Sequence, residues 1–195
     1  MRYLGRVTGT IVRYCRGLRQ YCLQDASIKS FSGLESLYMQ ECFDFLAGLD
    51  IKYELVEHEA VYTVEEAMRV LPGRTEIKNL FVQDDKGRRQ YLVIMPGLKR
   101  LNLKQLATDL NEKKVRFCSA EKVETMLGVK PGSVSLFCCL NPNSHHVKVI
   151  FDKDLLKEKE LGFHPIVNTA TLFIRPENIH PILAALPQSH EIMAL

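Results

Sequence analysis

Short apolar segments with two alternating kinds of spacing constrain the fold of this chain most strongly. From Gly33 onward, apolar residues recur either at every third or fourth position, as on a helix face, or at every second position, as on a half-buried strand. No apolar run approaches the roughly 20 residues that a membrane-spanning helix needs. The pattern predicts an α/β domain of the mixed α+β kind, with a mixed, largely antiparallel central sheet and helices packed on it.

Individual elements follow from the same spacing. Helices are expected over 35–48, 64–71, 102–110, 120–127 and 177–186, and strands over 51–55, 79–83, 90–95, 115–118, 134–140, 146–152 and 168–174. The turn at 84–87 should join two of these strands in a hairpin. We expect Asn102 and Ser119 to cap helices, Gly128 to end one, and Pro181 to kink the last one.

The first 33 residues differ in charge from the rest of the chain. They carry six basic residues against one acidic residue, a net charge of +5, whereas the remaining 20 basic and 22 acidic residues give −2. An organelle-type presequence, an accessory RNA-contacting arm and a start site placed too far upstream all fit this segment, and the last is favoured. We therefore treat residues 1–33 as a basic extension and expect it to be dispensable for the chemistry.

The cysteine pattern points to free thiols. The six cysteines form no CxxC pair and no metal-finger spacing, and no secretory signal precedes them, so reduced thiols in a cytoplasmic protein are expected. Adjacent His145 and His146 would point to opposite faces of a strand, which disfavours a zinc site. The signatures of dinucleotide binding, P-loops, zincins and nucleophile elbows are also absent from the sequence. The residue pattern by itself therefore predicts only an α/β domain.

Three segments, in this order, resemble the YbaK-like aminoacyl-tRNA editing family, whose domain is also inserted in bacterial prolyl-tRNA synthetases. The first is Lys78-Asn79-Leu80-Phe81, and the second, at 127–137, is similar to L-G-V-x-P-G-S-V-T-P-F with Ser135 and Leu136 in place of the usual threonine and proline. The third, at 163–171, is similar to the F-H-P-x-x-N-x-A-T segment of free-standing ProX and PrdX proteins. The likeness runs from about Leu37 to Leu195.

The resemblance implies a YbaK/prolyl-tRNA synthetase editing-domain fold over residues 34–195 and hydrolysis of the ester in a mischarged tRNA. The third segment implies alanine on tRNA for proline as the substrate. Cysteine, serine or another amino acid is the nearest alternative, and a non-catalytic module that binds tRNA or docks on a synthetase is the alternative of a different class. The implied partners are the acceptor end of mischarged proline tRNA and, further, prolyl-tRNA synthetase. No metal, organic cofactor or membrane is implied.

The same three segments supply the candidate site residues. Lys78 is the candidate catalytic residue, because an ammonium group can stabilise the oxyanion that forms when an aminoacyl ester is hydrolysed. The candidate substrate-binding residues come from all three segments: Asn79, Gly132, Ser133, His164, Asn168 and Thr171. Structural roles remain open for Asn79, Asn168 and Thr171. The basic cluster Lys86, Arg88 and Arg89 in the hairpin, with Lys99, Arg100 and Lys104 beyond it, fits either tRNA contact or ordinary solvation equally well.

Overall fold

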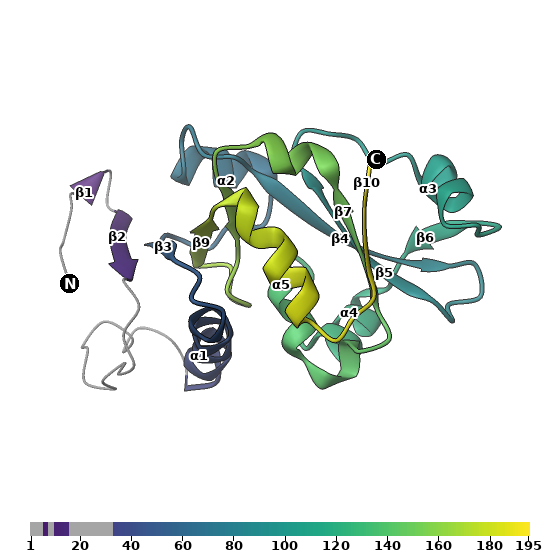
Figure 1. The fold of residues 1–195 in the computed structure, drawn as a ribbon, viewed down its shortest axis with the longest axis horizontal. Helices are drawn as coiled ribbons and strands as arrows, with labels where there is room; N and C mark the ends of the chain where they lie inside the picture. The colour runs from purple at the N-terminus through teal and green to yellow at the C-terminus, as the bar shows by residue number, and fades with distance from the viewer. Residues whose placement is uncertain (1–5, 8–9, 16–32) are drawn as a thin grey trace.

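The computed structural model describes residues 6–7, 10–15 and 33–195 of the chain, and within them two five-stranded sheets carry the fold (Figure 1). Sheet A has the order β1-β2-β3-β9-β8 and sheet B the order β10-β7-β5-β4-β6. Sheet A is antiparallel throughout, whereas sheet B combines antiparallel and parallel pairs. The mixed architecture predicted from the sequence is confirmed, although its strands divide between two sheets.

Sheet B contains the predicted hairpin. Strands β4 (Ile77–Asp84) and β5 (Gln90–Pro96) pair antiparallel, with Lys78 opposite Met95. Strand β6 (Val115–Phe117) extends the antiparallel part beside β4, while β7 (Lys148–Asp152) and β10 (His190–Met193) add parallel strands beside β5. The long β4–β5 pair runs across the molecule in Figure 1, with α2 near one end and α3 near the other.

Sheet A is built around β3 (Tyr53–Glu57), which lies between β2 (Thr10–Cys15) and β9 (Ala170–Ile174). The short strands β1 (Arg6–Val7) and β8 (Leu161–Phe163) form its two edges. Part of the basic extension therefore pairs with the first strand of the predicted domain, a contact that the charge pattern did not indicate.

The predicted helices and most of their caps are confirmed. The helices are α1 (Gly33–Gly48), α2 (Val64–Val70), α3 (Leu103–Asp109), α4 (Ala120–Leu127) and α5 (Ile179–Ala185). Asn102 accepts hydrogen bonds from the N–H groups of Lys104 and Gln105, and the left-handed Gly128 ends α4. A reciprocal capping box between Thr63 and Glu66 starts α2.

The strand predicted over 134–140 is wrong. Residues Leu136–Leu140 form a 3₁₀ helix, for which the buried Ser135 is the N-cap, and Pro142–Ser144 form a second 3₁₀ turn capped by Asn141. The apolar stretch of residues 136–139 is buried on every side, and periodicity cannot distinguish a buried strand from a buried helical turn.

The helix predicted over 177–186 begins later than expected, which changes the place of Pro181 in it. Pro176–Asn178 form a separate 3₁₀ turn before α5, so Pro181 is the third residue of a helix that begins at Ile179. The N–H groups in the first turn of a helix have no partner within the helix, so proline costs little there. The 3₁₀ turn Lys153–Lys157 and the short strands β8 and β10 were not predicted, because three to five residues carry little periodicity.

Two hydrophobic clusters stabilise the fold. The larger cluster joins both sheets with α1, α4 and α5, and includes the free thiols of Cys42, Cys138 and Cys139. The smaller cluster lies between the opposite face of sheet B and α3. Among the described helices, none is long and apolar enough to cross a membrane.

Arg74 connects three segments around sheet A. Its guanidinium group lies 2.8 Å from a carboxylate oxygen of Glu54 on β3 and 2.6 Å from one of Glu160, just before β8. The same group stacks over the ring of Phe173 on β9, at 4.3 Å from its centroid. The loop that leads into β4 is therefore anchored to sheet A by charge and by cation–π contact.

We predict that Arg74→Met lowers the free energy of unfolding by about 2 kcal/mol, because it leaves the Glu54 carboxylate, 13% exposed, without its cation. Arg74→Lys should recover only part of this loss, since a lysine cannot reproduce the planar fork. Urea denaturation at neutral pH measures both, with the exposed Arg69→Met on α2 as the matched control. Equal destabilisation by Arg74→Met and the control would contradict this account.

Candidate active site

The site centres on the loop that follows β3, which the sequence analysis did not single out. The backbone N–H of His58 donates to the Thr169 carbonyl at 2.9 Å, and the N–H of Val61 donates to the Asn168 carbonyl at 3.1 Å. These bonds continue the β3–β9 pairing beyond the strand ends. They fix the third family-like segment against residues 58–61.

His58 and Thr171 form a defined side-chain pair. The Nδ1 atom of His58 lies 2.7 Å from the Glu59 carbonyl, which can only accept a hydrogen bond, so Nδ1 carries the proton. Its Nε2 lies 2.9 Å from the Thr171 hydroxyl and, in the neutral ring, accepts the hydroxyl proton. Burial lowers the pKa of His58, which favours this neutral form.

His164 is held in the same way. Its Nδ1 lies 3.0 Å from the Ala170 carbonyl and therefore donates to it, which leaves Nε2 as the acceptor atom. Its ring stands edge-on to that of His58, with 6.1 Å between centroids and 62° between planes. Burial, and to a lesser degree the neighbouring His58, lower the pKa of His164. Two neutral imidazoles with fixed tautomers thus line one side of the site.

The turn after His164 stores backbone strain. Ile166 has a φ of 67°, in the left-handed region that a β-branched residue rarely adopts. Such a conformation costs on the order of 1–3 kcal/mol and persists only where surrounding contacts impose it. Here the side chain of Ile166 packs against the larger hydrophobic cluster, and the hydrogen bonds on either side hold the backbone.

Tyr62 and Gly132 meet on the other side of the loop. Gly132 has a φ of 98°, and a Cβ atom at this position would lie only 3.1 Å from Cδ1 of the Tyr62 ring. Both the backbone conformation and this close approach require glycine. The N–H of Gly132 donates no hydrogen bond to any residue that the structure describes. Ser133 is half-buried beside it, and its own N–H closes a turn onto the Lys130 carbonyl at 3.1 Å.

The beginning of β4 lies next to the same loop. Glu76, opposite Gly97, accepts a 2.7 Å backbone hydrogen bond from it, and a Cβ atom at Gly97 would lie 3.1 Å from Val64. Because alternate residues of a strand share a face, Glu76 and Lys78 both belong to the face that Val64 covers. Loop 58–64 therefore contacts the turn at Gly132 and residues 168–171, and its last residue, Val64, lies beside Gly97, opposite Glu76 at the start of β4.

Lys78 and Asn79 occupy different environments. Lys78 is half-buried, burial lowers its pKa, and no described residue forms an ion pair or hydrogen bond with its ammonium group. Asn79 shares the opposite face with Phe81, toward the larger cluster, and its buried Oδ1 has no hydrogen-bond partner in the described part of the chain. The two candidates do not project from the same face of β4.

Contacts within the described residues link some candidates and not others. Thr171 is joined to His58, and Asn168 contributes its carbonyl to Val61. No interaction joins Lys78 directly to His164 or Gly132 in the part of the molecule that is described. Of the predicted basic cluster, Arg89 is paired with Glu112, and Arg88 lies 3.9 Å from Asp84, while Lys86 is exposed on the hairpin turn.

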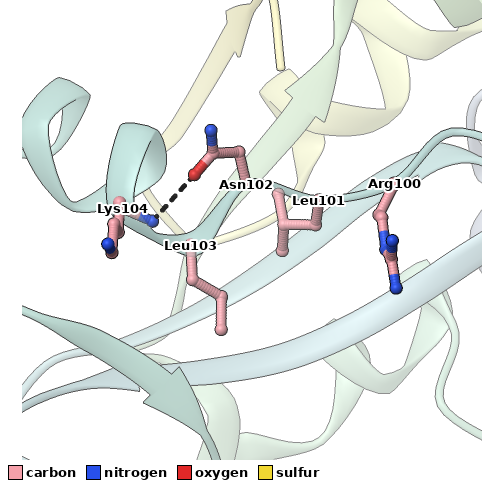
Figure 2. A pocket seen from close by; sticks show the side chains of 5 residues that line it. All are labelled: Arg100, Leu101, Asn102, Leu103 and Lys104. Carbon is pink, nitrogen blue, oxygen red and sulfur yellow. Dashed lines mark hydrogen bonds between the residues drawn. The ribbon is translucent and has the colours of Figure 1, made fainter.

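Two surface hollows lie away from these residues. Figure 2 shows the first, lined by residues 100–104 at the start of α3, where Asn102 caps the helix and Arg100 and Lys104 are exposed. It is made by one continuous segment, without polar groups converging from other elements, so it lacks the character of a binding site. The second, near Arg89 and His146, is lined by charged groups that are already paired, including Glu112 and Lys148. Neither hollow contains a residue of the three family-like segments.

The comparisons with known proteins agree with this architecture. The sequence model of the aminoacyl-tRNA editing domain matches residues 58–180. Prolyl-tRNA editing protein ProX of Acetoanaerobium sticklandii is 35% identical over 142 residues, which cover 72% of this chain and 87% of ProX. Prolyl-tRNA synthetase associated domain-containing protein 1 of Bos taurus is 34% identical over 143 residues, which cover 68% of this chain and 81% of that protein.

A solved structure shows the same fold. A proposed trans-editing enzyme for prolyl-tRNA synthetase superposes with a TM-score of 0.62 at 20% identity, covering 85% of this chain and 99% of that one. The family match and the similarity to ProX therefore define an editing domain. The chain belongs to the aminoacyl-tRNA editing domain family, and it is an aminoacyl-tRNA deacylase.

His58 is the residue that reasoning from the sequence missed. A signal for its loop was present, because Thr63-Val64-Glu65-Glu66 has the spacing of a capping box and so predicts a fixed helix start. The pairing of His58 with Thr171, 113 positions later in the chain, carries no local signal.

Glu76 supplies a test of the low polarity at the start of β4. Burial raises the pKa of Glu76 from 4.5 to about 7, so folding disfavours its ionised form. The destabilisation caused by burying the ionised carboxylate of Glu76 begins as the pH rises above 4.5 and is complete above about 7. We predict that Glu76→Gln is more stable than wild type at pH 8, by about 1–2 kcal/mol after the full shift is reduced for the partial exposure of Glu76, and that the difference disappears near pH 4.5.

Urea denaturation at several pH values measures this effect. The exposed Glu177→Gln is the matched control and should show no comparable dependence on pH. A Glu76→Gln variant that gains no stability at pH 8 relative to acidic pH would show that the carboxyl group is solvated in the folded protein.

Proposed function

We propose that this deacylase releases alanine from mischarged proline tRNA and leaves prolyl-tRNA intact. The observation that carries the proposal is that one loop, 58–64, contacts both the Gly132 turn and the His164 segment and ends at Val64, beside Gly97 in the strand pair that contains Lys78. The name and similarity of ProX support proline tRNA as the substrate class. The products are free alanine and a tRNA with a free terminal hydroxyl, formed by adding water across the ester.

Lys78 is the proposed catalytic residue. Attack on the ester carbonyl produces a tetrahedral intermediate that carries an oxyanion, and a nearby ammonium stabilises that charge. The half-buried ammonium of Lys78 has no anionic partner within the described residues, and burial lowers its pKa. Burial destabilises the charged ammonium, and a negative charge that develops nearby would offset this destabilisation. The interaction therefore strengthens as the transition state forms.

The other candidates are proposed to hold the substrate. The Gly132 N–H is available as a donor for a carbonyl or ribose oxygen, and Ser133 lies beside it. His164 presents Nε2 as an acceptor for the α-amino group or for the attacking hydroxyl. Asn79 offers a buried acceptor oxygen without a partner, while Asn168 and Thr171 position the segment through their contacts with loop 58–61.

Selection between amino acids is proposed to depend on pocket size. A synthetase cannot strongly reject a smaller amino acid, because one or two missing methylene groups change binding by only about 1–3 kcal/mol. A second site that admits alanine can instead exclude the proline ring by collision with the Gly132 turn or the strained turn at Ile166.

The proposed partners and domain follow from the same reasoning. We propose that residues 34–195 form the editing domain, which binds the acceptor end of tRNA in the cytoplasm and cooperates with prolyl-tRNA synthetase. The family match at 58–180 lies within this range. The pairing of β2 with β3 gives part of the extension a structural role in sheet A.

Lys78→Ala should reduce the single-turnover rate of alanyl-tRNA hydrolysis by about 100- to 1,000-fold, because the oxyanion loses its cationic partner. Lys78→Arg should recover little activity, since the wider guanidinium cannot replace a compact ammonium. The exposed Lys130→Ala, in the second family-like segment, is the matched control.

Circular dichroism verifies that each variant is folded. A folded Lys78→Ala protein that retains more than about a tenth of the wild-type rate would remove Lys78 from the transition state, given the expected magnitude. Absence of turnover by the wild-type protein on every aminoacyl ester would instead favour a non-catalytic binding module.

The size sieve predicts which charged tRNAs survive. Proline tRNA charged with alanine should be deacylated at least about tenfold faster than the same tRNA charged with proline, corresponding to a steric penalty above about 1.4 kcal/mol. Tests with cysteine and serine on the same tRNA define the upper size limit. Equal rates for alanine and proline would exclude selection by size.

A further inference from the structure

Tyr62 is an exposed aromatic side chain whose backbone is held in one position. Tyr62 is 66% exposed. Its backbone N–H donates a hydrogen bond to a Glu66 carboxylate oxygen at 2.7 Å. The same oxygen accepts a hydrogen bond from the Thr63 N–H, and the Glu66 N–H donates back to the Thr63 hydroxyl. Because the backbone of Tyr62 is already fixed, a ligand that covers its ring orders only the side-chain torsions.

The ring stands at the border of the proposed site. Its edge contacts Gly132, where no side chain separates the ring from the turn, and Val64, two residues later, covers the strand face of Lys78. Val61, immediately before Tyr62, is hydrogen-bonded to the Asn168 carbonyl. A molecule lying against the exposed part of the Tyr62 ring would therefore adjoin the groups proposed to act on the ester.

We propose that Tyr62 stacks against the base of the tRNA's 3′-terminal adenosine. This inference rests on the proposed function and deepens it. The amino acid of a charged tRNA is esterified to the ribose of that nucleotide, so the base and the reacting ester are attached to the same sugar. A surface that binds the base must lie beside the groups that hold the ester, and Tyr62 adjoins Gly132, whose N–H is proposed to bind the ester carbonyl or the ribose.

The surroundings favour a neutral base over a phosphate or the amino acid. Glu59 and Glu65, on either side of Tyr62 in sequence, are both exposed and would repel phosphate groups. The ring is also too exposed to enclose a small amino acid, whereas base stacking requires only one open aromatic face. Stacking of a base on an aromatic side chain is worth about 1–3 kcal/mol.

A binding experiment separates the base from the remainder of the tRNA. We compare an uncharged acceptor-stem RNA hairpin ending in C-C-A with the same hairpin whose terminal nucleotide lacks its base. Tyr62→Ala should raise the Kd of the complete hairpin about tenfold, consistent with the stacking energy, and leave the Kd of the abasic hairpin unchanged. Tyr62→Phe should bind both hairpins as the wild type does.

Controls make the result specific to the aromatic ring. Met68→Ala removes another exposed apolar side chain, from the adjacent helix α2, and should change neither Kd. Tyr62→Leu preserves apolar bulk without an aromatic face, so it should raise the Kd of the complete hairpin as Tyr62→Ala does. It therefore tests the proposal if the alanine variant folds poorly. Equal weakening of both hairpins by the Tyr62 variants, or no weakening of either, would overturn the proposal.

Deacylation is measured separately. Tyr62→Ala should raise the KM for alanyl-tRNA about tenfold with a smaller effect on kcat, if stacking acts on binding. A wild-type protein that fails to deacylate alanyl-tRNA while showing the predicted difference between hairpins would refute the proposed function and leave the stacking proposal supported.

Discussion

Two backbone hydrogen bonds beyond the ends of β3 and β9 determine the arrangement of the site. The bonds from His58 to Thr169 and from Val61 to Asn168 keep two departing loops together after regular strand pairing ends. Each other feature depends on this junction. It sets the approach of His58 to Thr171, and it maintains the left-handed turn at Ile166. It also carries Tyr62 toward Gly132.

The site combines several ionisable groups that are kept from ordinary solvation. Burial favours neutral rings in His58 and His164, a neutral carboxyl in Glu76, and a less stable ammonium in Lys78. All four shifts have burial as their first cause, although the groups lie at two places, the histidines beside sheet A and Glu76 and Lys78 at the start of β4. Low polarity around an ammonium strengthens its interaction with a charge that develops during a reaction, which suits the role proposed for Lys78 in ester hydrolysis.

The sequence predicted local structure better than it predicted the relations between distant residues. Asn102 and Gly128 have a chemistry that determines helix ends locally, so their roles could be recognised from their neighbours. The apolar residues 136–140 gave the wrong element, because full burial removes the periodic pattern that distinguishes a strand from a helical turn. The candidate residues came from family resemblance. The partnership of His58 with Thr171 requires sheet A to form first, and no local pattern encodes it.

The reactivity of the buried thiols can report when the hydrophobic core of this protein opens. Cys138 and Cys139 are fully buried in the larger cluster, and burial raises the pKa of Cys138 to about 12. The thiolate form of cysteine is the nucleophile that attacks a thiol reagent, so these buried residues stay unreactive until the core opens. Cys118 is only half-buried, and burial raises its pKa to about 11. The relative labelling rates at Cys118 and Cys138 would therefore distinguish local fluctuation at the edge of sheet B from opening of the whole core.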